Sequence, residues 1–150
     1  MQGLGRRLRP TWHTARFLLL FVCIATACES DTNLRIEGGN PPVFIMSGSG
    51  SLRSIRIRGP KKQRDIAGPD ASAYWYIKSD KDGALDVEEV GKLTYGVVPE
   101  GYTQIFPERG SAPPLIEGEV YFIQVSTANA NGTQKHFYLK NGKAIEKPDQ

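Results

Sequence analysis

The stretch Leu115-Ile-Glu-Gly118-Glu-Val-Tyr121-Phe-Ile-Gln-Val125 carries the clearest structural signal in the chain. After the glycine, the residues Tyr121, Ile123 and Val125 occupy every second position. Successive side chains of a β-strand point to opposite faces, so these three residues share one face. The pattern predicts a strand that is entered through a sharp corner at Gly118 and turns its aromatic and aliphatic side chains toward a core.

The same period of two recurs through residues 42–146, with turn residues between the runs. Ile55 and Ile57 alternate with two arginines, and Trp75 and Ile77 alternate with two tyrosines and a lysine, so the isoleucines and the tryptophan are expected to face inward. The Asn-Gly pairs at 131–132 and 141–142 are typical of type I′ hairpin turns. About seven short strands with regular turns predict an all-β, immunoglobulin-like sandwich. The expected strands are residues 43–46, 52–58, 74–78, 92–95, 103–106, 120–127 and 135–140, with a further edge strand at 34–37.

The quoted stretch resembles the tyrosine corner of fibronectin type III domains, where a leucine, a glycine three residues later and a tyrosine three residues further lead into a core strand. Gly118 permits the corner, and the Tyr121 hydroxyl can hydrogen-bond the backbone upstream while its ring joins the core. Glu117 stands where a proline is common. The resemblance implies a fibronectin type III-like sandwich and no particular activity, because such sandwiches host many functions. Residues 93–104 also resemble uncharacterised bacterial lipoproteins that carry such a domain.

The N-terminus has the pattern of a bacterial lipoprotein signal peptide. Residues 17–27 form an uncharged run that is shorter than the roughly 20 residues needed to span a bilayer, and four arginines precede it. The run ends in Ala25-Thr-Ala27-Cys28, which resembles the lipobox, although Ala25 stands where leucine is usual. We expect cleavage between Ala27 and Cys28 and lipidation of Cys28. The expected organisation is a signal peptide at 1–27, a lipidated tether at 28–41 and a sandwich at 42–150.

Three alternatives to this N-terminal interpretation remain open. An ordinary secretory signal would be cut after Ala27 and would leave Cys28 as a free thiol. A twin-arginine signal would use Arg6 and Arg7, although the expected apolar residues do not follow the pair directly. An uncleaved membrane anchor is the third alternative.

Cleavage would change the charge of the protein. The whole chain has 19 basic and 16 acidic residues, and removing the four arginines of residues 1–27 leaves 15 basic against 16 acidic, a net charge of −1. A near-neutral domain does not favour nucleic-acid binding, which depends on clustered cations. Cys28 would be the only remaining cysteine, so no internal disulfide can form.

A candidate binding surface combines tyrosines with a basic stretch. If Trp75 lies in the core, Tyr74 and Tyr76 project outward on the same strand. Basic side chains on the preceding strand and loop could attract anionic lipid, polysaccharide or an acidic protein. The alternatives are a merely solvated basic face and tyrosines that only pack across strands. The basic residues of this candidate surface are Arg56, Arg58, Lys61 and Lys62.

Residues 78–89 resemble an EF-hand calcium loop at several positions. The candidate ligands are Asp80, Asp82, Asp86 and Glu89, with Gly83 at the turn. Lys78 occupies the first position, where an aspartate is normal, and its ammonium would repel the ion. The residues before it also predict a strand instead of a helix. A polar turn between strands is therefore the favoured interpretation, and neither a metal nor a cofactor is expected.

Nothing in the sequence indicates catalysis. The exported part contains one histidine, His136, on the expected outer face of a strand, and no nucleophile elbow or phosphate loop is present. The sequence therefore predicts a non-enzymatic lipoprotein that faces the periplasm or the cell exterior. Its expected role is a structural module that binds another envelope protein. A carbohydrate-binding or surface-binding adhesin is the alternative, and a calcium-dependent module is a minor one.

Overall fold

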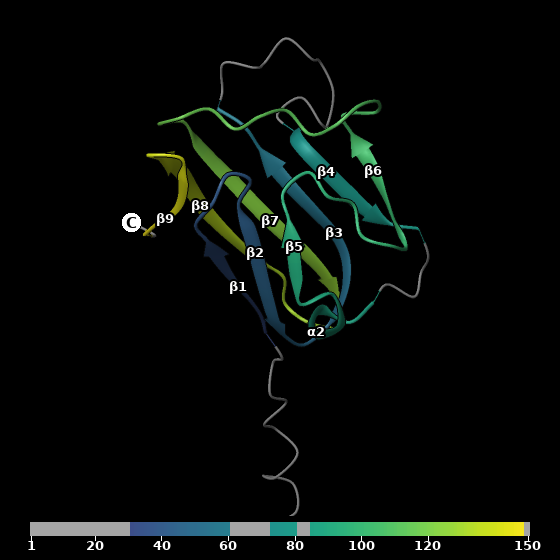
Figure 1. Cartoon of the computed structure of the whole chain (residues 1–150). Coiled ribbons are helices and arrows are strands. Elements are labelled where there is room, and N and C mark those ends of the chain that lie inside the picture. Colours follow the sequence, from purple (N-terminus) through teal and green to yellow (C-terminus); the bar gives the residue numbers. More distant parts are fainter. Residues whose placement is uncertain (1–30, 61–72, 81–84, 149–150) are drawn as a thin grey trace, which may run out of the picture.

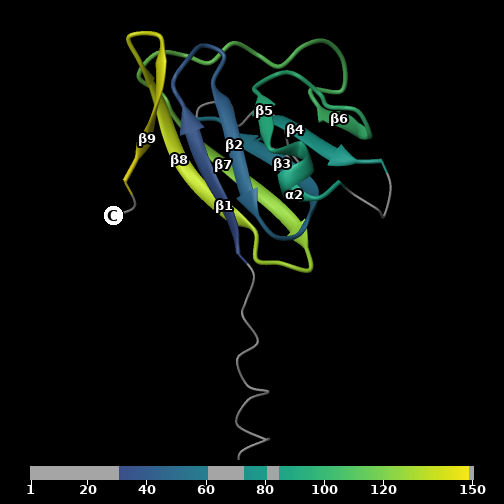
Figure 2. The same cartoon turned by 60° about the horizontal axis from the view of Figure 1, so that its bottom comes forward.

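The computed structural model describes residues 31–60, 73–80 and 85–148, and they form a sandwich of two antiparallel sheets (Figure 1). One sheet has three strands in the order β1-β2-β5, and the other has six in the order β6-β4-β3-β7-β8-β9. The three-stranded sheet packs against the larger sheet, and Figure 2 shows the two layers from a second direction. The fold expected from the sequence, an all-β sandwich of the immunoglobulin type, is confirmed. The bounds of the strands are β1 Thr32–Glu37, β2 Val43–Gly48, β3 Ser51–Arg58, β4 Ala73–Ser79, β5 Lys92–Thr94, β6 Tyr102–Phe106, β7 Val120–Ala128, β8 Thr133–Lys140 and β9 Lys143–Lys147.

The described residues contain nine strands, which is more than the sequence pattern predicts. The edge strand expected at 34–37 begins at Thr32, and both Thr32 and Leu34 are buried. β9 was not expected, because its two apolar residues, Ala144 and Ile145, are adjacent and do not alternate with polar residues. A one-turn helix, α2 (Val87–Val90), was also not expected and places the fully buried Val87 in the core.

The core lies between the sheets and is built by the alternating residues identified in the sequence. Ile55, Ile57, Trp75 and Ile77 are fully buried, as their strand positions predict. The rings of Phe44 and Phe137, from opposite sheets, meet edge to face with centroids 5.9 Å apart. These contacts join the two layers directly, and burial of such aromatic and aliphatic surface is the main force that holds a sandwich together.

The tyrosine corner has the geometry that its sequence predicts. Gly118 has φ +79°, a conformation that glycine adopts without strain, and Tyr121 is fully buried. The backbone N–H of Ile116 donates a hydrogen bond of 2.8 Å to the Tyr121 hydroxyl. The hydroxyl therefore satisfies an upstream backbone group, while its ring stacks on Phe137 with centroids 5.5 Å apart. The corner fixes where β7 enters the sheet.

Two further tyrosines hold the connection between β6 and β7 across the end of the sandwich. The Tyr95 hydroxyl donates to the Pro113 carbonyl and the Tyr74 hydroxyl donates to the Pro114 carbonyl, both at 2.7 Å. Proline cannot donate a backbone hydrogen bond, but its carbonyl oxygen remains an acceptor. Burial raises the pKa of Tyr95 well above its usual value, because the charged phenolate would lose its hydration.

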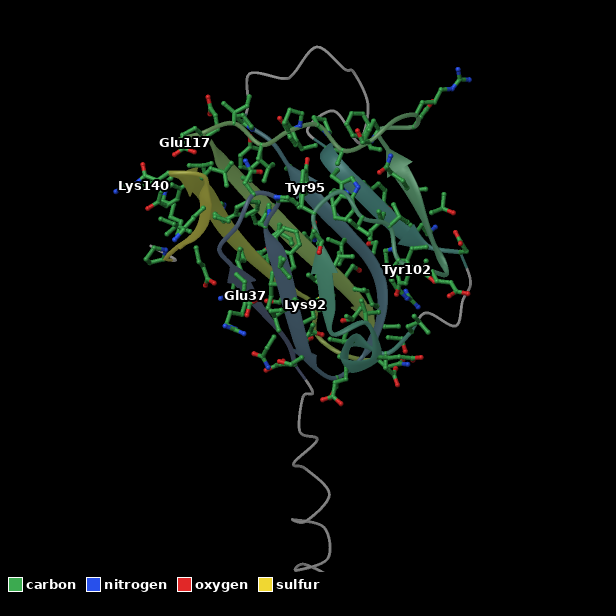
Figure 3. The ribbon with its side chains drawn as sticks, in the orientation of Figure 1. Glu37, Lys92, Tyr95, Tyr102, Glu117 and Lys140 are labelled. Atoms are coloured by element: carbon green, nitrogen blue, oxygen red, sulfur yellow. The ribbon has the colours of Figure 1, made fainter. Side chains whose placement is uncertain are left out.

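Tyr102, at the start of β6, makes a similar buried hydrogen bond. Its hydroxyl donates a 2.8 Å hydrogen bond to the Leu52 carbonyl. Burial, with a smaller contribution from Glu89, raises the pKa of Tyr102 to about 12. Burial likewise raises the pKa of Tyr121 to about 12. Figure 3 shows Tyr95 and Tyr102 at separate places within the sandwich, so these hydroxyls stabilise different parts of the fold.

The last hairpin is fastened to the corner by one side chain. Asn141 and Gly142 have φ values of 54° and 68°, as the predicted type I′ turn requires. Glu117, beside the corner glycine, accepts hydrogen bonds from the backbone N–H groups of both turn residues. Figure 3 shows Glu117 and Lys140 at this corner of the sandwich. The hairpin that carries β9 is therefore held against the start of β7.

The turn between β7 and β8 differs from its prediction. Asn131 does not have a positive φ, and Asn129, with φ 61°, takes the left-handed conformation instead. Gly132 serves a different purpose from the one expected, because a Cβ atom there would lie 2.4 Å from the Val125 carbonyl oxygen. A longer connection replaces the two-residue turn, and Gly132 lets the two backbones approach.

Candidate binding surface

The outer face of the six-stranded sheet gathers cations from four of its strands. Strand register places Arg56 beside Tyr76 and Gln124, and Arg58 beside Phe122. The next strands continue these rows, because Phe122 pairs with His136 and His136 pairs with Lys147. We call this surface the basic face. Its cations are Arg56, Arg58, Lys78, Lys140, Lys143 and Lys147, and its aromatic residues are Tyr76, Phe122, His136 and Tyr138.

Among the residues of the six strands, cations outnumber carboxylates. All six strands lie within the described part of the chain, and Glu146 is their one acidic residue. It alternates with Ile145 and Lys147 of the basic face, so it points to the other side, where it forms an ion pair with Lys135. The strand residues of the basic face therefore carry a surplus of positive charge, which attracts anionic groups.

Aromatic rings lie beneath the two arginines. The Arg56 guanidinium carbon is 4.3 Å from the centre of the Tyr76 ring, and that of Arg58 is 5.8 Å from the Phe122 ring. Both distances are within the range of cation–π attraction. The Phe122 and His136 rings are 4.9 Å apart. These contacts hold the guanidinium groups against the sheet, so less side-chain entropy remains to be lost when a partner binds.

Apolar and polar areas flank the arginines along the sheet. Toward the β8–β9 turn, Val120 and Ile145 are 40% and 38% exposed on either side of Tyr138. Toward the β7–β8 turn there is an open hollow of about 390 Å³, whose lining includes Gln124 and Gln134. The remaining lining residues are Val125, Ser126, Thr127, Gly132 and Thr133. The basic face thus combines charge, rings, aliphatic surface and amide groups.

Tyr74 does not belong to this surface, and the expectation that it projects outward is wrong. It is 3% exposed, its hydroxyl bonds the Pro114 carbonyl, and its ring meets Tyr121 edge to face. The cause is a β-bulge: Ile57 pairs with Trp75 but Arg58 pairs with Ala73, so Tyr74 is an extra residue that breaks the alternation. Gly59 leaves room for the ring, because a Cβ there would lie 2.5 Å from it.

Tyr76, Arg56 and Arg58 do come together as the sequence suggests. Lys61 and Lys62, which were expected to extend the surface, lie outside the described residues, as do Ala27 and Cys28. The sequence did not bring Phe122, His136 and Lys147 into the candidate surface. The alternation places Phe122 and His136 outward, but their alignment with Arg58 depends on the order and register of strands.

The candidate calcium ligands are separated among different contacts. Asp80 accepts a hydrogen bond from Thr103 of β6, whereas Asp86 accepts one of 3.1 Å from Ser51 of β3. Glu89 is exposed on α2, and Asp82 lies outside the described residues. Among residues 31–60, 73–80 and 85–148, no three histidine, cysteine, aspartate or glutamate side chains are grouped in a way that could hold a metal ion.

The outer face of the three-stranded sheet has a different electrostatic character. Arg35 forms an ion pair of 2.9 Å with Glu37, and Lys92 of β5 lies 3.8 Å from the same carboxylate. Figure 3 shows Glu37 and Lys92 next to each other on this sheet. These two cations share one acidic neighbour, whereas Arg56 and Arg58 contact aromatic rings.

No protein-family model, curated protein or solved structure matches the chain. The described residues also include no helix with the length and apolar character of a membrane span.

Proposed function

We propose that the protein is a non-catalytic lipoprotein of the bacterial envelope that binds another envelope protein through the basic face. The observation that carries this proposal is the contact of Arg56 with Tyr76 and of Arg58 with Phe122 on the basic face, where cations outnumber carboxylates among the residues of the six strands. Arginine and aromatic residues are enriched where protein interfaces concentrate their binding energy. Rings that already hold the guanidinium groups reduce the entropy lost on binding.

Lipidation of Cys28 supplies the location in this proposal. The lipobox-like sequence that ends at Cys28 supports a diacylglycerol anchor and cleavage after Ala27. One lipid chain gives only marginal membrane binding, whereas two or more give a stable anchor. A Cys28→Ala chain should therefore lose lipid labelling and appear in the soluble fraction. Membrane association of the unaltered chain without lipid labelling would contradict the anchor.

Site-specific cross-linking tests the binding surface. A photoreactive amino acid placed at Phe122 lies in the centre of the basic face, and one placed at Ile45 occupies the outer face of the other sheet with similar partial burial. In intact cells, the probe at position 122 should give a discrete cross-linked product with a protein, and the probe at position 45 should not.

The charge of the face provides the matched comparison. Arg56→Glu with Arg58→Glu should reduce the product from position 122 by 10-fold or more, since repulsion replaces attraction at both arginines. Arg35→Glu with Lys92→Glu changes the same amount of charge on the other sheet and should leave the product unchanged. Equal loss with both pairs, or equal products from both probe positions, would contradict binding through the basic face.

A second candidate is binding of a glycan of the envelope, and the hollow beside the arginines favours it. Gln124 and Gln134 line the hollow and lie in the row of Tyr76. Amide groups next to an aromatic ring suit a sugar, whose hydroxyls and ring face need both kinds of contact. Retention of the purified chain on cell-wall glycan, lost with Tyr76→Ala and retained with Tyr138→Ala, would favour this candidate over a protein partner.

A further inference from the structure

A row of apolar side chains crosses the basic face near the β8–β9 turn. Strand register places Val120 of β7 beside Tyr138 of β8, and Tyr138 beside Ile145 of β9. Val120 and Ile145 are exposed, and Tyr138 is half-buried between them. We call these three side chains the apolar row. Adjacent strands are about 4.8 Å apart, so the row is roughly 10 Å long.

Lysines border the apolar row on the side of the turn. Two residues further along their strands, Lys140 lies beside Lys143, and both are exposed. Glu117 lies at the same corner as Lys140 (Figure 3) and offsets part of this charge. Its carboxylate accepts hydrogen bonds from the backbone N–H groups of Asn141 and Gly142. The first border of the row therefore consists of two lysines that extend into solvent.

A second border lies two residues along the strands in the opposite direction. Its members, in order across four neighbouring strands, are Arg58 of β3, Phe122 of β7, His136 of β8 and Lys147 of β9. Side chains on one face of a strand are separated by about 7 Å. The two borders are therefore roughly 14 Å apart, and the apolar row lies midway between them.

We propose that the apolar row binds an acidic amphipathic helix of the partner protein, with the helix axis across the strands. A helix with its side chains is about 10 to 12 Å wide, so it fits between borders that are roughly 14 Å apart. One helical turn of about 5.4 Å is close to the strand spacing of about 4.8 Å. Apolar residues at helix positions i, i+4 and i+7 therefore meet the three members of the row in turn.

The charge on both sides of the row specifies the chemistry of this helix. Burial of its apolar stripe against the row supplies affinity, as in other helices that bind to apolar surfaces. Carboxylates on both sides of the stripe face the lysines of one border and Arg58 and Lys147 of the other, which selects an acidic helix over a basic one. This inference rests on the proposed function, because it specifies the protein that binds the basic face.

A second copy of the chain and a lipid surface fit the apolar row less well. Two copies joined through this row would bring their lysines together, and like charges oppose such a contact. An amphipathic segment on a membrane buries its apolar side about 5 to 10 Å into the bilayer boundary. Val120 and Ile145 are less than half exposed and are shorter than the lysines around them, so they do not reach that depth.

Cross-linking from the middle of the row tests the inference with the full chain in intact cells. Tyr138 is replaced by p-benzoylphenylalanine, which is also a para-substituted ring, and mass spectrometry identifies the peptide that becomes attached to it. Val120→Ser with Ile145→Ser removes the aliphatic members of the row. Val97→Ser with Val98→Ser makes a similar change at exposed residues of the β5–β6 connection and is the matched control.

The attached peptide should contain more carboxylates than cations and should have apolar residues at a spacing of three or four. The two substitutions in the row should reduce the product by about fivefold or more, because the buried aliphatic contacts are lost. The control pair should leave it unchanged. Attachment to a peptide without this pattern, to lipid or to a second copy of the chain would overturn the inference, as would equal losses with both pairs.

The probe at Phe122 separates this inference from the proposed function. If position 122 gives a protein product and position 138 gives none, the protein partner stands and the helix is refuted. If neither position gives a protein product, the proposed function is refuted together with the helix.

Discussion

The outer faces of the two sheets differ in how their charged side chains are arranged. On the three-stranded sheet, Glu37 lies between Arg35 and Lys92, so the charges are satisfied by each other. On the six-stranded sheet, Arg56 and Arg58 rest on aromatic rings, and cations outnumber carboxylates among the residues of the six strands. The first arrangement is what a solvated surface needs. The second leaves a surplus of positive charge on the strands, which stabilises the fold little and attracts anionic groups.

This difference implies that the basic face contributes much less to folding than the interior behind it. Trp75 and Tyr76 are neighbours on β4 with opposite directions, so they form a matched pair. Trp75→Ala should reduce the free energy of unfolding by about 3 to 5 kcal/mol, because a fully buried ring is lost. Tyr76→Ala should cost less than about 1 kcal/mol. Urea denaturation measures both values, and similar losses would show that the basic face is structural.

The buried tyrosine hydroxyls should make the stability of the fold depend on pH. The pKa of Tyr102 and of Tyr121 is raised to about 12 in the fold, against about 10 when unfolded. Between pH 10 and pH 12 the folded state binds more protons than the unfolded state. The free energy of unfolding is therefore highest below pH 10 and decreases as the pH rises toward 12. Each tyrosine should lower the free energy of unfolding by about 1 to 2 kcal/mol over this range. Urea denaturation from pH 9 to 12 measures the slope, and Tyr121→Phe should reduce it. A flat profile would contradict the burial of these hydroxyls.

The tyrosine corner itself gives a smaller effect. Tyr121→Phe keeps the ring but leaves the Ile116 N–H without its partner, which should cost about 1 to 2 kcal/mol at neutral pH. Tyr138→Phe, on the basic face, makes the same chemical change and should alter the free energy of unfolding by less than about 0.5 kcal/mol. Thermal unfolding of both variants tests this contrast. An equal cost would mean that Tyr138 has a structural role of its own.

The smallest expected effect concerns the balanced face. Glu37→Gln leaves Arg35 and Lys92 without their shared carboxylate and should reduce the free energy of unfolding by about 0.2 to 1 kcal/mol at low salt. The difference should shrink at 1 M salt, where exposed charges are screened beyond about 3 Å. A loss that is independent of salt would indicate that Glu37 acts through something other than charge.

The sequence could predict the inside of this fold better than its outside. Ile55, Ile57, Trp75 and Tyr121 were assigned to the core correctly, because strict alternation carries that information within each strand. Tyr74 was assigned wrongly, since a single bulge between Ile57 and Arg58 shifts the alternation, and bulges depend on the partner strand.

The candidate surface was predictable only in part for a related reason. Tyr76, Arg56 and Arg58 are close in sequence, and adjacent strands bring them together. Phe122 and His136 join them only because β7 lies next to β3 and β8 lies next to β7. Local pattern does not determine which strands are neighbours, so half of the surface emerged only with the sheet order.

β9, the strand that the alternation did not predict, affects whether crowded molecules aggregate. It forms one free edge of the six-stranded sheet, and a free edge can recruit the strand of another molecule into an aggregate. Lys143 and Lys147 lie at the two ends of that edge, and such lysines oppose pairing with an identical neighbour. Lipid anchoring would confine the molecules to two dimensions, where collisions between edges are frequent. The lysines of β9 would then allow many copies to share one membrane without polymerising.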